Sequence, residues 1–175
     1  AKESNRIVTA NASIDKRSNG GKARKNAILQ KPEAALQLIR NALKAGIKAS
    51  YVLMDTWFTN EPFIANILAE GLDVIGMLKD NKQYYIYKGK KYNLKQIGKL
   101  VSFHKPGDIL FSICVKTGKQ NIPVKLVFVR NRNKRSEYIV LLSTDCTLSS
   151  EEIVRTYGNR WSIELFFRAS KSLLD

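Results

Sequence analysis

The residues best suited to chemistry gather in one segment, YGNRWSIELFFRASK at 157–171. Four polar residues in it follow one another at spacings of three, four and seven: Tyr157, Arg160, Glu164 and Lys171. These are helix spacings, so the four side chains are expected on one face, within a stripe roughly 60° wide. Arg168 falls close beside that stripe. A single carboxylate among cations suits a site for a divalent metal and a phosphate group.

Bulky apolar residues surround the polar stripe. Trp161 flanks it on one side and Phe167 on the other, and Ile163, Leu165 and Phe166 occupy the rest of the circumference. An ordinary surface helix has the opposite proportions, so the pattern predicts a partly dry groove. Two interpretations remain open: a metal-and-phosphate site, or a structural Glu–Arg–Lys ion network on a mostly buried helix.

The composition points to a polyanionic partner. The 175 residues include 30 Lys and Arg against 15 Asp and Glu, a formal net charge of +15, which favours nucleic acid. No apolar run reaches the roughly 18–20 residues of a membrane span, and no signal peptide is present. Cys114, Cys146 and the single His104 provide neither a zinc site nor a histidine triad. We therefore expect a cytoplasmic protein without membrane association.

The middle of the sequence predicts a βαβ unit. A helix beginning near Pro32 ends at Gly46. The apolar run YVLM then leads to Asp55, the helix EPFIANILAE ends at Gly71, and DVIGML forms a second buried strand. Two buried strands joined by a helix pair in parallel. Since ligands gather at the carboxyl ends of such strands, Asp55 is a candidate site residue.

The flanking segments have a different character. Residues 81–145 predict a hairpin around KGKK and three further antiparallel strands with basic turns, placed to carry Lys and Arg along DNA.

The last helix begins at a Ser149–Glu152 capping box, and Gly158 inside it predicts a kink or a close backbone approach. Near the N-terminus, Gly20 and Gly21 precede three basic residues. That run is either a phosphate-gripping loop or a flexible arm, and its basic residues are Lys22, Arg24 and Lys25.

The segment YGNRWSIELFFRASK resembles the Y-x2-R-x3-E-x6-K signature of DDE transposases from bacterial insertion sequences, and YVLMDTWF resembles the strand carrying their second Asp. The β-rich stretch between them resembles the insertion these enzymes carry. The resemblance implies a ribonuclease-H-like α/β core over 1–80 and 146–175, with an antiparallel β-rich insertion over 81–145.

The resemblance also implies the function, which is metal-dependent cleavage of DNA at transposon ends and strand transfer into target DNA. It implies the roles of the residues as well. Asp55 and Glu164 match the family's second Asp and its Glu, so they are the expected catalytic residues and ligands of Mg²⁺ or Mn²⁺. The signature residues Tyr157, Arg160 and Lys171 are implied to hold double-stranded DNA, and synapsis of two ends implies a transient homodimer. Trp57 and Trp161 would by analogy stack on displaced bases, although core packing is the favoured interpretation for both.

One departure limits what this polypeptide is expected to do. The family has a first Asp on an opening strand, and nothing upstream of Asp55 matches it, because Asp15 lies in the polar stretch SIDKRSNGG. We expect that strand, its Asp and the end-recognition domain to be missing, so that the chain alone binds DNA without cutting it. A non-catalytic DNA-binding fragment of a decayed element and a metal-dependent nuclease on the same fold are the alternatives.

Overall fold

The computed structural model describes residues 15–27, 29–80, 83–100, 107–131, 134 and 136–174. The chain divides into two compact units, one ending at Lys48 and the other beginning at Ala49. The first unit contains two helices, α1 (Asn19–Ala27) and α2 (Lys31–Lys44). As predicted, α2 has Pro32 in its first turn, and Gly46 follows it at φ +83°.

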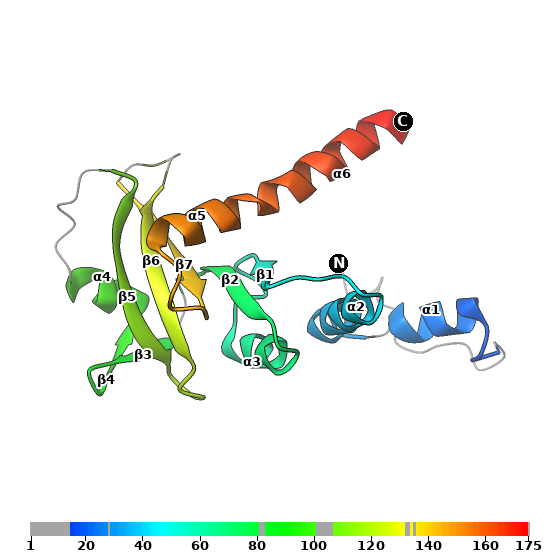
Figure 1. Cartoon of the computed structure of the whole chain (residues 1–175), viewed down its shortest axis with the longest axis horizontal. Coiled ribbons are helices and arrows are strands. Elements are labelled where there is room, and N and C mark those ends of the chain that lie inside the picture. The colour runs from blue at the N-terminus through cyan, green and yellow to red at the C-terminus, as the bar shows by residue number, and fades with distance from the viewer. Residues whose placement is uncertain are drawn as a thin grey trace. The chain divides into compact units, whose positions relative to one another are not determined.

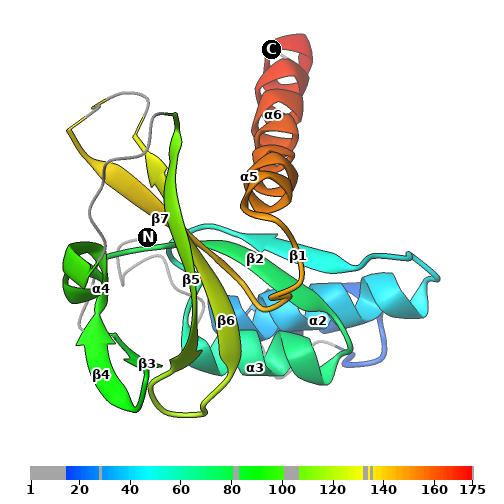
Figure 2. The same cartoon turned by 60° about the vertical axis from the view of Figure 1, so that its left-hand side comes forward.

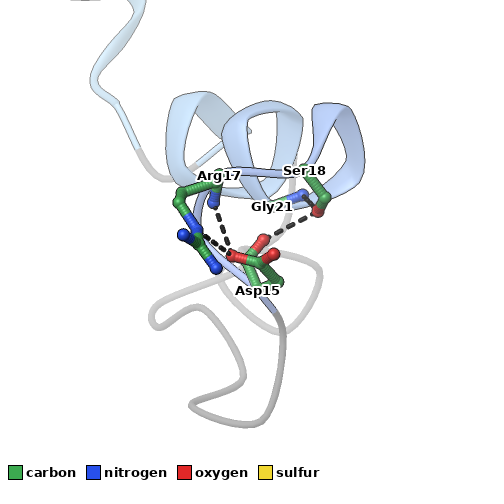
Figure 3. A network of polar contacts seen from close by, with 4 residues as sticks. All are labelled: Asp15, Arg17, Ser18 and Gly21. Carbon is green, nitrogen blue, oxygen red and sulfur yellow. Dashed lines mark hydrogen bonds and ion pairs between the residues drawn. The ribbon is translucent and has the colours of Figure 1, made fainter.

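Helix α1 begins in a network of polar contacts (Figure 3). The Ser18 hydroxyl donates to the Asp15 carbonyl at 2.7 Å and accepts from the Gly21 amide at 3.0 Å, as an N-cap does. A Cβ on Gly21 would lie 2.2 Å from the Asp15 carbonyl oxygen, so this turn requires glycine. Both proposed interpretations of Gly20 and Gly21, a phosphate loop and a flexible arm, are therefore wrong, because both glycines lie inside a capped helix.

The second unit is a mixed α/β unit with seven strands and four helices among its described residues. In chain order they are β1 (Tyr51–Met54), α3 (Glu61–Ala69), β2 (Asp73–Leu78), β3 (Tyr84–Tyr87), β4 (Lys90–Asn93), α4 (Leu94–Leu100), β5 (Ile109–Thr117), β6 (Pro123–Arg130), β7 (Tyr138–Ser143), α5 (Ser150–Gly158) and α6 (Arg160–Leu174).

These strands form one sheet in the order β1-β2-β7-β6-β5-β3-β4. The β1–β2 pair is parallel, as the predicted βαβ unit requires, and the remaining pairs are antiparallel, as predicted for 81–145. Strand β7 pairs directly with β2, so the later strands extend the sheet that the βαβ unit begins. The short helices α1 and α4 were not predicted.

Side chains alternate between the two faces of the sheet and meet different helices. Ile75 of β2, Val127 of β6 and Leu141 of β7 pack with Ile153 and Tyr157 of α5. Figures 1 and 2 show α5 on one side of the strands and α3 on the other. The buried face of α3 consists of Phe63, Ile64 and Ile67. The core is thus a sheet between two helical layers.

The β3–β4 hairpin turns through Lys88 and Gly89, whose φ angles are +48° and +76°. Positive φ at both central residues defines a type I′ turn, which matches the twist of the strands and prefers Asn-Gly or Gly-Gly. A lysine in the left-handed region costs roughly 1–2 kcal/mol. The residue at position 88 is therefore not the one that the turn itself favours.

A buried carboxylate joins α3 to the β5–β6 turn. Glu61, 5% exposed, accepts hydrogen bonds from the backbone amides of Lys119 and Gln120. It lies in the first turn of α3, where a negative charge is favourable. The contact ties the tip of a long hairpin to the helical layer beneath the sheet.

Replacing Glu61 with Ala should lower the free energy of unfolding by about 1.5–3 kcal/mol, because hydrogen bonds to a charged group have that worth. Urea denaturation followed by circular dichroism measures the change. Glu61→Gln keeps an acceptor oxygen and should lose less. Equal stability of Glu61→Ala and the unsubstituted chain would contradict this role.

The Tyr85 hydroxyl is buried without a hydrogen-bond partner among the described residues. Burial, and then the charge of Glu61, raise the pKa of Tyr85. The unfolded chain releases this proton near pH 10 while the folded chain keeps it, so stability falls as the pH rises above about 10. Tyr85→Phe should make that fall less steep by up to about 1.4 kcal/mol per pH unit.

Urea titrations between pH 8 and 11 test this expectation. Tyr84→Phe removes a hydroxyl from the neighbouring, half-exposed ring and serves as the matched control. An alkaline slope in Tyr85→Phe identical to that of the unsubstituted chain would show that Tyr85 does not cause it.

Candidate active site

Asp55 follows the last residue of β1, and its side chain shapes the turn that comes next. Its Oδ1 accepts from the amide of Trp57 at 2.9 Å and from that of Phe58 at 3.3 Å, which is an Asx turn. The Thr59 hydroxyl donates to the Asp55 carbonyl at 2.6 Å. Both ends of the turn are therefore fixed to Asp55, which holds the carboxylate at the carboxyl end of the parallel pair.

Thr59 is in turn held by a glycine on β2. A Cβ added to Gly76 would lie 2.4 Å from the Thr59 hydroxyl oxygen and 2.8 Å from its methyl carbon. Thr59 itself is buried. The sequence analysis missed this pair, although a glycine inside a strand marks a close approach of another group.

Helix α5 brings Tyr157 to the same region. The predicted capping box is confirmed, with the Ser149 hydroxyl and the Glu152 carboxylate each bonded to the other's backbone amide. Two turns later the Tyr157 ring is buried in the core beside Ile153. The Tyr157 hydroxyl is also buried and has no hydrogen-bond partner in the described part of the chain.

Charges from two distant segments act on that hydroxyl. Burial raises the pKa of Tyr157, the positive charge of Arg160 opposes the rise, and the carboxylates of Asp55 and Glu164 add to it. Asp55 and Glu164 are 109 positions apart in the sequence, yet both lie near enough to influence one phenol. Asp55, Arg160 and Glu164 therefore all lie within electrostatic range of Tyr157.

Arg160 links the members of this group. Its Nη1 lies 2.8 Å from Oε1 of Glu164, one helical turn further on. Its guanidinium carbon lies 5.7 Å from the ring centroids of both Tyr157 and Trp161, within cation–π range. The Nε of Arg160 is buried and has no hydrogen-bond partner among the described residues. A planar cation with a free donor beside a carboxylate is suited to a phosphate oxygen.

The predicted helix tightens between these residues at Asn159, which keeps helical torsion angles of φ −60° and ψ −20°. α5 ends at Gly158, and α6 begins at Arg160 after Asn159. The amide of Asn159 bonds to the Thr156 carbonyl, and that of Ser162 to the Asn159 carbonyl, both at 3.1 Å. No atom lies within 4 Å of a Cβ built on Gly158. Of the two roles predicted for Gly158, close approach is therefore wrong, while a kink remains a prediction beside the tightened turn at Asn159.

The partly dry groove predicted around the polar stripe is not formed. Along α6 the large apolar side chains are exposed, Trp161 at 58%, together with Ile163, Leu165, Phe166 and Phe167. Trp57 is 54% exposed, so core packing of either tryptophan is wrong as well. Helical periodicity shows which side of α6 carries the apolar residues. It does not show whether another part of the protein packs against that side.

The other cations lie further away along the chain. Arg168 and Lys171 are exposed on α6. Lys22 and Arg24 are exposed on α1, and Lys25 belongs to the same helix. These three are part of the first unit, whereas Asp55 and Glu164 are part of the second.

The described residues contain no group of three or more His, Cys, Asp or Glu side chains placed to hold a metal ion. Two carboxylates, Asp55 and Glu164, both lie within electrostatic range of Tyr157, and Mg²⁺ retains several waters and needs few protein oxygens. The donor set is therefore compatible with such an ion, although it is a small one.

The sequence matches the family model of the transposase DDE domain over residues 26–175. The chain belongs to this family. The match confirms the predicted resemblance to DDE transposases, while the branch with the Y-x2-R-x3-E-x6-K signature stays a prediction. For a DDE transposase domain it implies polynucleotidyl transferase or nuclease chemistry that depends on divalent metal, with DNA as the partner. No curated protein matches this DDE transposase domain. None of its described helices combines the length and apolar character needed to cross a membrane.

The buried, unpartnered hydroxyl of Tyr157 leads to a stability prediction for the DDE transposase domain. The hydroxyl of Tyr157 interacts with the Arg160 side chain without good hydrogen-bond geometry, so the free energy of unfolding of Tyr157→Phe should stay the same or rise by up to about 1 kcal/mol. The matched control is Tyr51→Phe, because the Tyr51 hydroxyl donates to Asp145 Oδ2 at 2.9 Å. That variant should lose about 1 kcal/mol. Urea denaturation of both variants measures the difference, and equal losses would contradict it.

Proposed function

We propose that this chain is the catalytic-core part of a bacterial DNA transposase that cuts transposon ends and joins them to target DNA. The observation that carries the proposal is that Asp55 and Glu164, from distant parts of the sequence, both lie within electrostatic range of Tyr157. These two acids come from a strand end and a late helix, and both match the family's pattern. The bacterial nucleoid would then be where the protein acts.

We propose that its architecture is a ribonuclease-H-like core over 1–80 and 146–175 with an insertion over 81–145. The parallel β1–β2 pair, joined by α3 and ending at Asp55, supports this assignment. The mostly antiparallel strands between Lys79 and α5 support the insertion. The first Asp of the family has no assigned residue in this proposal.

Asp55 and Glu164 would hold Mg²⁺ or Mn²⁺. When bound, such an ion activates a water or a 3′-hydroxyl and stabilises the leaving oxygen. The protein's own contribution is positional. The Asx turn and Thr59 fix Asp55, while Arg160 holds the Glu164 carboxylate through Nη1 and has further guanidinium donors suited to a phosphate oxygen.

The remaining residues would bind the DNA. Lys171 and Arg168 lie exposed beyond Glu164 on α6, where they would contact phosphates away from the cut. The exposed Trp161 ring, beside the Arg160 guanidinium, offers a flat surface for a base. On the first unit, Lys22, Arg24 and Lys25 would add sequence-independent contacts. Synapsis of two ends would bring two copies together as a transient homodimer.

Two other functions fit the same charge distribution. A non-catalytic DNA-binding fragment would bind DNA without needing Asp55 or Glu164. A nuclease on the same fold would need both acids and would cut without joining. The experiments below distinguish all three.

Metal binding is tested first, because it does not depend on turnover. Trp57 and Trp161 lie two and three positions from Asp55 and Glu164, so tryptophan excitation should sensitise the luminescence of bound Tb³⁺. Mg²⁺ or Mn²⁺ should quench it by competition. Asp55→Asn and Glu164→Gln should each reduce the signal at least about tenfold, as expected when one charged ligand is lost. The control Glu151→Gln removes an exposed acid from α5 and should leave it unchanged.

The second test measures DNA binding, nicking and strand transfer by the same variants with Mn²⁺. Glu164→Gln should keep DNA affinity and lose any cleavage, because it removes a metal ligand and no phosphate contact. Lys171→Ala should weaken binding and lower the salt slope by about one unit. The Glu164 side chain is 43% exposed, so Glu164→Gln should cost less than about 1 kcal/mol of stability.

A different set of results would overturn the proposal. Undiminished Tb³⁺ luminescence in both acid variants would favour the non-catalytic fragment. Cleavage products without joined products would favour the nuclease. A loss of about 3–5 kcal/mol in Glu164→Gln would favour the structural ion network.

A further inference from the structure

The end of the sheet farthest from Asp55 has an unusual concentration of positive charge. Between Asp80 and Asp108 the sequence contains seven lysines and no Asp or Glu. Lys95 of α4 is paired with Asp80 at 2.8 Å. The lysines of the β3–β4 hairpin have no such partner: Lys88, Lys90 and Lys91 are exposed and form no ion pair with any described acid.

Strand register shows how these charges are arranged: Lys90, opposite Tyr87, projects to one face of the hairpin and Lys91 to the other. Ile86 of β3 pairs with Lys91 of β4 on one side and with Lys116 of β5 on the other. Residues directly opposite one another project to the same face, so Lys91 and Lys116 stand on one face about 10 Å apart, at two strand spacings. Tyr84, on the same face two residues before Ile86, is half exposed.

The opposite face of the hairpin is anchored in the core. Tyr85 is fully buried, as are Ile97 of α4 and Thr117 of β5. The lysines are therefore mounted on a packed element and not on a loose loop. Such mounting holds several like charges close together, an arrangement that is unfavourable unless an external anion neutralises it.

The turn provides an independent observation. Lys88 has φ +48° at the first central position of a type I′ turn, where Asn or Gly is the favoured residue. Its ammonium group lies 5.4 Å from the centroid of the Tyr87 ring. A non-glycine residue kept in the left-handed region is a feature found at functional sites. Charge is what lysine supplies here and asparagine does not.

We infer that the β3–β4 hairpin, through Lys88, Lys90 and Lys91 with Lys116 beside them, binds the phosphate backbone of double-stranded DNA independently of its sequence. Lysine is a flexible point charge that suits phosphates and does not distinguish bases. β4 is one edge of the sheet and β1 the other. At about 4.8 Å per strand, the hairpin stands roughly 25–30 Å from β1. That distance corresponds to about 8 base pairs, at 3.4 Å each. The hairpin thus contacts DNA away from the bond to be cut.

Lys88→Asn separates this role from folding. Because asparagine suits the turn, the variant should melt at the same or a higher temperature than the unsubstituted chain. Because one phosphate contact is lost, its salt slope for duplex DNA should fall by about 0.9. The matched control is Lys134→Gln, which removes a lysine already paired with Glu137 and should leave the slope unchanged.

The closing experiment measures fluorescence anisotropy of a 30-base-pair duplex with the whole chain, without metal, at several KCl concentrations. The triple variant Lys88→Asn/Lys90→Thr/Lys91→Thr should fall in salt slope by about 2.7 and lose at least about tenfold in affinity. The fall should be the same for unrelated duplex sequences and in a Glu164→Gln background. Threonine suits strands, and circular dichroism checks that the variant is folded.

The inference rests on the proposed function only in taking DNA as the partner. Different results would overturn the proposed function and the inference about the hairpin. If the unsubstituted chain does not bind duplex DNA, the proposed function fails. If the chain binds but the triple variant binds equally with an unchanged slope, the hairpin inference alone is overturned. A fall in melting temperature for Lys88→Asn would also overturn it, because lysine would then be serving the turn.

Discussion

Among the described glycines of the second unit, Gly76 leaves the least room for a side chain, because the Thr59 side chain occupies that space. That contact joins the sheet to the turn after β1. Thr59 reaches the Asp55 carbonyl from one side while the Asp55 carboxylate binds two amides of the same turn from the other. Any side chain at position 76 would displace Thr59 and with it the turn that orients the acid. The position of Asp55 therefore depends on Gly76 of β2 having no Cβ atom.

The rest of the site depends on how α5 is seated. Ile153 and Tyr157 pack against residues of β2, β6 and β7, so the sheet that ends at Asp55 also supports the helix that leads to Glu164. Tyr157 is both a core residue and the point at which the charges of Asp55, Arg160 and Glu164 meet. Its ring stabilises the fold, while its hydroxyl, buried and unpartnered, contributes nothing evident to that stability.

Sequence patterns predicted the elements whose signals are local. The apolar runs YVLM and DVIGML, the glycines that end α2 and α3, the Ser149–Glu152 capping box and the KGKK hairpin are all confirmed. The Arg160–Glu164 pair follows from i,i+4 spacing alone. Features set by tertiary contacts were not predicted. Helix α1 was not predicted because it contains two glycines and its start depends on a contact of Ser18. Periodicity in the sequence does not indicate that Gly76 accommodates Thr59. It does not indicate that α6 is exposed either.

The tightened turn between α5 and α6 is at Asn159, so the torsion angles of this residue set the direction of α6. Glu164 lies five residues beyond Asn159 and Lys171 twelve, or about 7.5 Å and 18 Å along a helix axis. A change of 10° in the direction of that axis shifts Glu164 by about 1.3 Å and Lys171 by about 3 Å, with the backbone of α5 unmoved. The torsion angles of Asn159 thus determine the positions of Glu164 and Lys171 together, with the larger displacement always at Lys171. A small rotation at Asn159 changes the distance between Glu164 and Asp55 by as much as the length of a covalent bond.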